Sequence, residues 1–304
     1  WHRPSLGLHA FDGSADNNIV FNLHSPAVLV DRFEQDSGKR YKMIGSTLKG
    51  YRVAHSPDGL NWTEYPENPV LDHFDTITLA QHPRTGEYLA YHKRPAVQRG
   101  FHRRVVWLSR STDFQHWSEP ELVFSPDATD DEWAGRVSER TEVYNMSVYP
   151  HAAGFIGLPT MFRVMKIRAG NQVGPGQSPL DGPIDVHLVT STDGRSWQRT
   201  WPRQNVIPRG SPGTYDAGAI LGLSSTLVDS GEETWIYYTA LTTGHGAPMP
   251  PKRISIGRAE WRRHGFVSLD AGPDGGRVET IPLTLSSPAL VVNADASRGE
   301  LRMA

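Results

Sequence analysis

The sequence predicts an all-β protein, a five-bladed β-propeller of four-stranded antiparallel blades around a central channel. Short runs rich in Val, Ile, Tyr and Thr alternate with tight turns, 29 Gly and 23 Pro punctuate the chain, and long stretches of helical periodicity are missing. Two motifs also recur along the chain. Repeated units of about 40–75 residues, none able to bury both of its faces alone, are typical of propellers.

The first motif is a hairpin that opens with an acidic residue. Each copy continues as a β-rich segment, turns at a Gly-containing loop and returns as an apolar strand. Its three clear copies read HFDTITLAQHPRTGEYLAYHKR (73–94), TEVYNMSVYPHAAGFIGLPTMFR (141–163) and YDAGAILGLSSTLVDSGEETWIYYTAL (215–241). The leading acids are Asp75, Glu142 and Asp216, and Asp16 in SADNNIVFN is the matching residue of the first unit. We therefore expect blades to begin near residues 16, 75, 142 and 216.

The second motif is Ser-x-Asp-(Gly/Phe)-x-x-Trp. It occurs as SPDGLNW (56–62), STDFQHW (111–117) and STDGRSW (191–197), each after a short strand. Ser and Asp side chains bond nearby backbone amides in such turns, and Trp covers a hydrophobic layer. We interpret Asp58, Asp113 and Asp193 as structural turn residues.

A fifth blade is expected to begin near residue 277, from RVETIPLTL, ALVVNAD and ELRMA. Residues 1–304 would then form a single catalytic propeller domain. The alternative is four blades followed by the start of a second β-domain after about residue 275.

Composition excludes several classes of function. A formal charge of −2 gives no reason to expect a nucleic acid or an anionic membrane surface as partner, and the basic stretch RGFHRRVV (99–106) is interpreted as a solvated hairpin. Apolar runs are too short to span a bilayer, and the lack of Cys excludes disulfides and thiolate metal sites. The chain starts at Trp1, so we expect a processed, trimmed or omitted N-terminus. The protein is expected to be soluble, with cytoplasmic and secreted locations both open.

The leading acids should converge at one end of the channel. The first strand of each blade lines the axis, and the second runs antiparallel to it, so the end of strand two lies beside the start of strand one. Asp75 should therefore lie near Lys93 and Arg94, and Glu142 near Arg163. Asp216 should lie near residues 242–246, which include His245.

Several carboxylates with basic neighbours are what glycoside hydrolysis requires. One carboxylic acid must stay protonated to assist the leaving group, and another must be ionised as base or nucleophile. Crowding of like charges separates their pKa values and lets similar groups take opposite roles.

The acid-led inner strands and Ser-x-Asp-Gly-x-x-Trp turns resemble the five-bladed propeller glycosidases, the group of glycoside hydrolase families 32, 43, 62, 68 and 117. The resemblance extends over about residues 10–290 and is one of architecture. ADNNIVFN is only loosely similar to the Asp-bearing first strand of the invertase-like members, and their Arg-Asp-Pro and Glu-Cys signatures are absent. Enzymes of this group use three axial carboxylates, one in blade one and two on later inner strands.

The resemblance implies a role for each acid. Asp16 would be the base or nucleophile, and Glu142, the one glutamate among the leading acids, would be the general acid. Asp75 or Asp216 would be the third carboxylate. The residues expected to bind substrate are Asn17, Arg94, Tyr144, Arg163 and His245. Arg94 and Arg163 are either substrate clamps or ion-pair partners of the inner acids.

The leading hypothesis is a glycoside hydrolase that cleaves a terminal bond, a furanoside such as an arabinofuranoside or fructofuranoside, in an oligo- or polysaccharide. A non-catalytic carbohydrate-binding propeller is the alternative, and a sialidase-like enzyme, drawn from the turns with Glu142 and Tyr144, ranks lowest. No cofactor is expected, since the 13 His show no metal-ligand spacing such as His-x-x-Glu-His. A structural Ca²⁺ on the axis is the alternative, and the oligomeric state is open.

Overall fold

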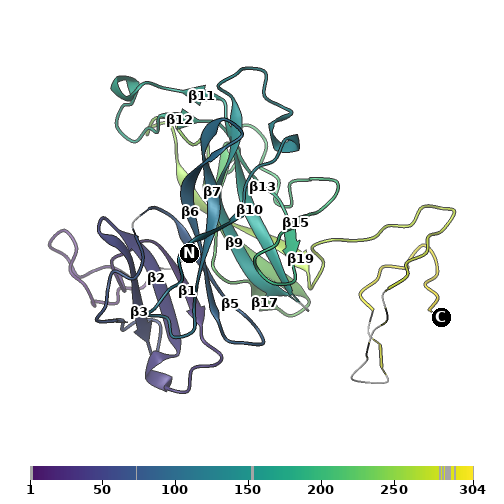
Figure 1. Ribbon diagram of the computed structural model, residues 1–304, viewed down its shortest axis with the longest axis horizontal. Helices are drawn as coiled ribbons and strands as arrows, with labels where there is room; N and C mark the ends of the chain where they lie inside the picture. The colour runs from purple at the N-terminus through teal and green to yellow at the C-terminus, as the bar shows by residue number, and fades with distance from the viewer. Residues whose placement is uncertain are drawn as a thin grey trace. The chain divides into compact units, whose positions relative to one another are not determined.

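A computed structural model describes residues 3–72, 74–151, 154–280, 282, 284, 289–290 and 292–303 (Figure 1). The described residues confirm the all-β class. Their helices are 3-10 turns of three residues each, and none is long enough to cross a membrane. These turns are η1 (Ser37–Lys39), η2 (Thr129–Asp131) and η3 (Gly170–Gln172).

The chain forms two compact units. The first comprises Trp1–Leu227 with Ile236–Ala259, and the second comprises Val228–Trp235 with Glu260–Ala304. In the second unit, β17 (Val228–Ser230) pairs antiparallel with the start of β18 (Glu233–Leu241). The functional residues discussed below belong to the first unit.

The first two sheets of the first unit each have four antiparallel strands in chain order. Sheet one contains β1 (His24–Val30), β2 (Tyr41–Thr47), β3 (Gly50–Ser56) and β4 (Thr63–Glu64). Sheet two contains β5 (Ile77–Gln81), β6 (Tyr88–Gln98), β7 (Phe101–Ser111) and β8 (Glu121–Phe124).

The third sheet has a divided third strand. Its strands are β9 (Arg140–His151), β10 (Gly154–Val164), β13 (Ile184–Val186), β14 (Val189–Ser191) and β15 (Gln198–Arg199). Both β13 and β14 pair antiparallel with β10. The predicted insertion at 170–183 lies between β10 and β13 and contains the short hairpin of β11 (Lys166–Ile167) and β12 (Leu180–Asp181).

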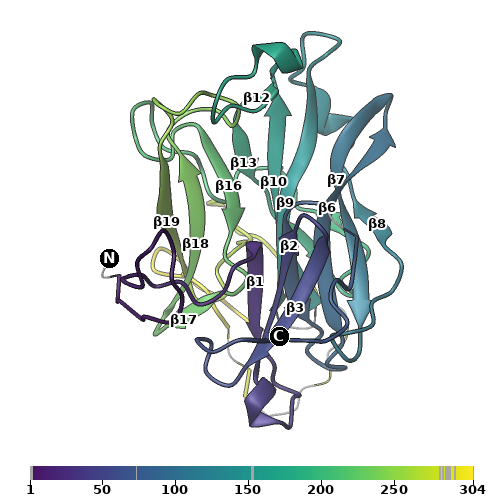
Figure 2. The ribbon, with the colours of Figure 1, turned by 90° about the vertical axis from the view of Figure 1, so that its left-hand side faces the viewer.

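The fourth sheet contains β16 (Ala219–Leu223), which pairs antiparallel with β18, and β19 (Ile254–Arg262), which also pairs with β18. One parallel pair, Ile184 with Ala219, joins β16 to β13. Figure 2 shows β18, β16, β10 and β6 in succession across the first unit.

The innermost strands of successive sheets lie side by side, as in a propeller. β5 lies beside β1, β9 beside β5, and β16 beside β9. Side-chain hydroxyl groups connect these neighbouring innermost strands by hydrogen bonds to backbone carbonyls. Thr78 Oγ1 donates to Met146 O at 2.5 Å, and Ser147 Oγ donates to Leu223 O at 3.1 Å. Val28 N donates to Ser225 Oγ at 3.2 Å and so connects sheets one and four.

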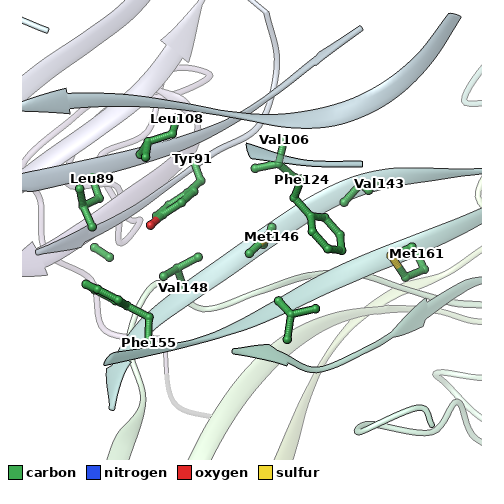
Figure 3. Packing of buried hydrophobic residues seen from close by; sticks show 12 residues of the cluster. Leu89, Tyr91, Val106, Leu108, Phe124, Val143, Met146, Val148, Phe155 and Met161 are labelled. Carbon is green, nitrogen blue, oxygen red and sulfur yellow. The ribbon is translucent and has the colours of Figure 1, made fainter. Parts of the chain in front are cut away.

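Hydrophobic clusters of the described residues fill the spaces between successive sheets. Between sheets two and three, Tyr91, Leu108 and Phe124 face Met146 and Phe155 (Figure 3). Similar clusters lie between sheets one and two and between sheets three and four. Each sheet buries its apolar side chains against its neighbouring sheets, which is why the units must be repeated.

The structure confirms that the three Ser-x-Asp turns are structural. In the first, Asp58 Oδ1 accepts hydrogen bonds from Leu60 N and Asn61 N, both at 2.8 Å, and Trp62 Nε1 donates to Gly59 O at 3.0 Å. Asp113 and Asp193 accept the equivalent bonds. Backbone N–H groups pointing at Asp58 hold its pKa below the ordinary value.

Phe114 replaces glycine in the second turn, although its backbone φ is +69°. Gly59 and Gly194 occupy the same position with φ of +77° and +72°. Phe114 is fully buried against Tyr88 and Trp117. We expect Phe114→Gly to lower the free energy of unfolding by about 2–4 kcal/mol. Losing a buried phenyl ring costs about 3–5 kcal/mol, and relief of the left-handed backbone returns about 1 kcal/mol. Urea unfolding measures the balance, and a more stable variant would contradict this account.

Two predicted boundaries need comment. The innermost strand of sheet one begins at His24, so the expected start near residue 16 is wrong, whereas β5, β9 and β16 begin close to 75, 142 and 216. The described residues between 275 and 304 contain no strand. Four groups of strands are therefore described, of which the third and fourth are joined into one nine-stranded sheet by the pair between β13 and β16. Both the fifth blade and the alternative second β-domain stay predictions.

Candidate functional site

Charged and aromatic side chains from four parts of the first unit gather around Asp75. We call this set the Asp75 cluster; it comprises His24, Asp75, Lys93, Arg104, Glu142, Tyr144 and His245. Sheet one supplies His24, and sheet two supplies the next three. Sheet three supplies Glu142 and Tyr144, and His245 lies in the loop after β18. Strands from separate sheets thus meet here, as the repeated hairpins predicted.

Asp75 lies two residues before β5 and carries the most accessible carboxylate of the cluster. Its Oδ2 is 2.5 Å from Lys93 Nζ and its Oδ1 is 2.9 Å from His24 Nε2. The backbone N–H of Asp75 donates to Tyr51 Oη at 3.1 Å, which fixes the residue on the buried part of sheet one. Burial raises the pKa of Asp75, but the Lys93 ammonium and His24 outweigh it, so the pKa is lowered overall. Asp75 is therefore an ionised carboxylate at neutral pH.

A cavity of about 530 Å³ adjoins this carboxylate. The side chain of Asp75 is 40% exposed. The residues that line the cavity are Asn22, Leu23, His24, Ser46, Thr47, Leu48, Phe74 and Asp75. The mixture of hydroxyl, amide, imidazole and aromatic groups is suited to a polar ligand that also has apolar faces.

Lys93 is held between the carboxylate and an aromatic ring. It is only 7% exposed, and its ammonium lies 3.7 Å from the centre of the Tyr144 ring. Burial lowers the pKa of Lys93 from 10.5 to about 8, although the Asp75 carboxylate opposes this change. A cation over an aromatic face is favourable, and the pair keeps the amine beside Asp75.

We expect any activity of this site to fall as the pH rises through about 8, because Lys93 then loses its proton and Asp75 loses its cationic partner. Stability should move the other way. The folded pKa lies below the unfolded value, so the unfolded chain binds more protons between about pH 8 and 10.5, and the Lys93 contribution to stability rises with pH there. A pH–rate profile together with thermal unfolding tests this. Lys93→Arg should remove the alkaline decline, and an unchanged profile in that variant would exclude Lys93 as its cause.

Glu142 is buried and held by two arginines. It is 1% exposed; Arg104 Nη1 lies 2.8 Å from Oε2, and Arg140 Nη2 lies 2.7 Å from Oε1. Arg104 comes from β7 and its guanidinium also lies over the rings of Tyr144 and Phe162. Arg104 therefore connects Glu142 to the part of the cluster that contains Lys93 and Asp75.

Tyr144 and His245 form the aromatic side of the cluster. Their ring centres are 4.9 Å apart, and the His245 ring is 5.1 Å from that of Phe162. Burial lowers the pKa of His245 to about 4, so the imidazole is neutral at pH 7. Burial and the nearby Asp75 carboxylate raise the pKa of Tyr144 to about 12. A phenol with this pKa is a poor nucleophile at neutral pH, which weighs against the sialidase-like hypothesis.

The other predicted site residues lie elsewhere. Asp16 is exposed in the N-terminal segment, where its backbone N–H bonds Ser14 Oγ, and Asn17 bonds His9 O, Ser14 O and Ile19 N. Asp216 is bonded by the hydroxyl groups of Thr214 and Tyr238, at 2.9 and 3.0 Å. Neither acid forms a hydrogen bond or ion pair with the Asp75 cluster among the described residues.

The two predicted arginines also separate. Arg94 lies over the rings of Phe74, at 4.0 Å, and Trp107, and its guanidinium forms no ion pair with a described residue. Arg163 is 3.4 Å from Asp185 rather than beside Glu142. Among the described residues neither guanidinium is paired with a leading acid, and the alternative that both bind substrate stays a prediction.

Sequence reasoning missed His24, Arg104 and Arg140. The stretch 99–106 was interpreted as a solvated hairpin, but Arg103 is 1% exposed against Asp131 and Arg104 binds Glu142. The length of the β6–β7 hairpin, which continues well past Lys93, is the signal that could have indicated this. For His24 no signal existed, because its contact depends on where β1 begins.

No metal centre is formed by the part of the chain that the structure describes, where no group of three or more His, Asp or Glu side chains is arranged to hold an ion. The axial Ca²⁺ stays a prediction.

No family model and no curated protein sequence matches the chain. Solved structures similar to it include an N-acetylgalactosamine deacetylase from F. plautii in complex with blood group B trisaccharide, at 17% identity, covering 84% of this chain and 92% of that one, with a TM-score of 0.36. A glycosyl hydrolase from Bacteroides ovatus is 13% identical, with 82% and 67% covered and a TM-score of 0.49.

A third similar structure is a β-fructofuranosidase of glycoside hydrolase family 32 from Bombyx mori. It is 12% identical, with 76% of this chain and 45% of that one covered, and the TM-score is 0.43. The chain thus spans less than half the length of the Bombyx mori enzyme.

Proposed function

We propose that the protein is a glycoside hydrolase that cleaves a terminal glycosidic bond at the Asp75 cluster. The observation that supports this best is the ionised, half-exposed Asp75 carboxylate beside a cavity of about 530 Å³, with a second carboxylate, Glu142, linked to it through Lys93, Tyr144 and Arg104. Hydrolysis of a glycoside requires such a pair of carboxyl groups flanking the bond.

In this proposal Asp75 is the base or nucleophile. It replaces Asp16 in that role, because Asp75 borders the cavity and Asp16 is bonded within the N-terminal segment. Lys93 and His24 keep Asp75 ionised and oriented. Glu142 is the general acid; for proton donation one of its oxygens must be released by Arg104, whose side chain is 25% exposed and lies on the projecting β6–β7 hairpin.

The substrate we propose is a terminal arabinofuranoside or fructofuranoside in an oligo- or polysaccharide. This part of the proposal follows from the resemblance to the propeller glycosidases. It also includes a fifth blade from about residue 277 and a single propeller domain over residues 1–304.

The test is a substrate panel with the full chain. Release of 4-nitrophenol is measured from aryl α-L-arabinofuranoside, β-D-xyloside, β-D-galactoside and β-D-glucoside, and release of fructose is measured from sucrose and inulin. We expect turnover of a furanoside that exceeds turnover of the pyranosides. Turnover of pyranosides alone would contradict the proposed furanoside specificity. A lack of turnover across the panel and across plant polysaccharides would contradict the proposed hydrolase activity.

A non-catalytic carbohydrate-binding protein is the second candidate. The observation that favours it is Glu142, whose two oxygens are both occupied by arginines in a site that is almost fully buried. Calorimetric binding of an oligosaccharide that is recovered intact after prolonged incubation would support this candidate over the hydrolase.

A further inference from the structure

A second cavity, of about 340 Å³, lies between sheet three and the connection from β8 to β9. Its lining residues come from five places in the chain. They are Thr129, Asp130, Trp133, Thr141, Met161, Arg163, His187, Arg203 and Asn205. Thr141 and Glu142 are neighbours on β9, and successive side chains of a strand point to opposite faces. Thr141 therefore lines this cavity while Glu142 belongs to the Asp75 cluster.

One wall of this cavity is fixed by ion pairs. Asp130 has a side chain only 2% exposed and binds Arg199 at 2.5 Å and Arg203 at 3.3 Å. Arg203 also binds Asp127, at 2.6 Å. The acids of this wall are thus neutralised within the protein. These two acids, Asp127 and Asp130, therefore do not neutralise any other cationic side chain of the cavity.

The cationic group left over is Arg163. Its side chain is 39% exposed, and its guanidinium donates no hydrogen bond to any residue that the structure describes. The nearest acid is Asp185, at 3.4 Å, and Asp185 is already bonded by Arg209 at 2.6 Å. One carboxylate shared by two guanidinium groups leaves a net positive charge at the cavity.

Polar atoms without partners surround the same cavity. His187 Nδ1 and Arg203 Nε are buried and have no hydrogen-bond partner among the described residues. Buried polar atoms are nearly always bonded in native proteins, so each such atom indicates a missing partner. Both residues line the cavity, so these two atoms lie in its wall, and a small side-chain movement would bring them to a ligand inside it.

The remaining lining is suited to a sugar ring. Trp133 is fixed by a hydrogen bond from its Nε1 to Thr141 Oγ1, at 2.8 Å, and offers an aromatic surface beside Met161. Asn205 is exposed at the rim and carries both a donor and an acceptor. Aromatic surface combined with convergent polar groups is the usual composition of a small-ligand site.

We propose that this cavity binds a sugar acid, with the ligand carboxylate on Arg163, its ring against Trp133 and its hydroxyl groups on His187, Arg203 and Asn205. Arg163 is suited to the carboxylate because a guanidinium presents two parallel N–H donors. This site does not depend on the Asp75 cluster and would exist in a hydrolase or in a binding protein.

Isothermal titration calorimetry with the full chain tests the proposal, using D-glucuronate as the probe and D-glucose, acetate and inorganic phosphate as comparisons. We expect D-glucuronate to bind, and glucose, acetate and phosphate to bind at least 10-fold more weakly. Arg163→Gln should weaken glucuronate binding at least 10-fold. Asp75→Asn, the matched control, should leave it unchanged. The indole N–H resonance of Trp133, assigned with Trp133→Phe, should shift as glucuronate is added.

Failure of glucuronate to bind at 10 mM would overturn the proposal, as would binding that Arg163→Gln leaves intact or that Asp75→Asn abolishes. If acetate bound as tightly as D-glucuronate, the cavity would be a simple anion site, and the proposal that it recognises a sugar ring would be overturned. Should Arg163→Gln fail to fold, His187→Leu is the second variant. We expect it to weaken glucuronate binding at least threefold, and unchanged affinity would contradict the proposed site.

Discussion

Asp75→Asn is expected to lower kcat/KM on the best substrate by about 10³-fold, the range lost when a catalytic acid or base is removed. The amide has nearly the shape of the carboxylate but cannot accept a proton or attack the anomeric carbon. The loss should appear in kcat more than in KM, because the substituted atoms act on the reacting bond. Steady-state kinetics on the purified variant, compared with the wild type at the same pH, measures it.

Asp216→Asn is the matched control for this prediction. Both acids precede an innermost strand, but Asp216 is bonded by the hydroxyl groups of Thr214 and Tyr238, whereas Asp75 borders the large cavity. Asp216→Asn should therefore retain kcat/KM within about threefold. A larger loss in Asp216→Asn than in Asp75→Asn would reverse the assignment of the base and place the reaction around Tyr238.

Glu142→Gln is expected to abolish hydrolysis and also to destabilise the fold by about 3–5 kcal/mol, the usual cost of removing one partner from a buried ion pair. The neutral amide leaves the guanidinium groups of Arg104 and Arg140 without the charge that balances them, and Arg140 has a side chain only 10% exposed. Urea unfolding gives the stability, and activity is measured well below the temperature at which the variant unfolds.

A double variant separates the loss of stability from the loss of activity. Arg140→Met combined with Glu142→Gln should recover part of the lost stability, because the buried cation is removed together with its partner. Activity should remain absent, because the proton donor is still missing. If Glu142→Gln is folded and fully active, Glu142 is a structural anchor for the two arginines and the general acid lies elsewhere in the Asp75 cluster.

The repeated hairpins show how far local sequence predicts this fold. Strand alternation and Ser-x-Asp turns depend only on interactions between residues close in sequence. Three of the four innermost strands and all three turns could therefore be located from the sequence. The start of the first innermost strand was misplaced near residue 16, because packing against β5 determines that β1 begins at His24.

The site follows the same division. The sequence alone predicted an acid at the start of each hairpin and the proximity of Asp75 and Lys93. It also predicted that acids from separate blades converge. Only the tertiary structure decided which acids meet, because His24, Lys93, Tyr144 and Arg104 are brought to Asp75 and Glu142 by contacts between sheets. The hairpin pattern placed Arg163 beside Glu142, but in the tertiary structure Arg163 lines the second cavity. The physical reason is that a strand's periodicity determines which residues share a face, whereas the partner of that face is chosen by how whole sheets pack against one another.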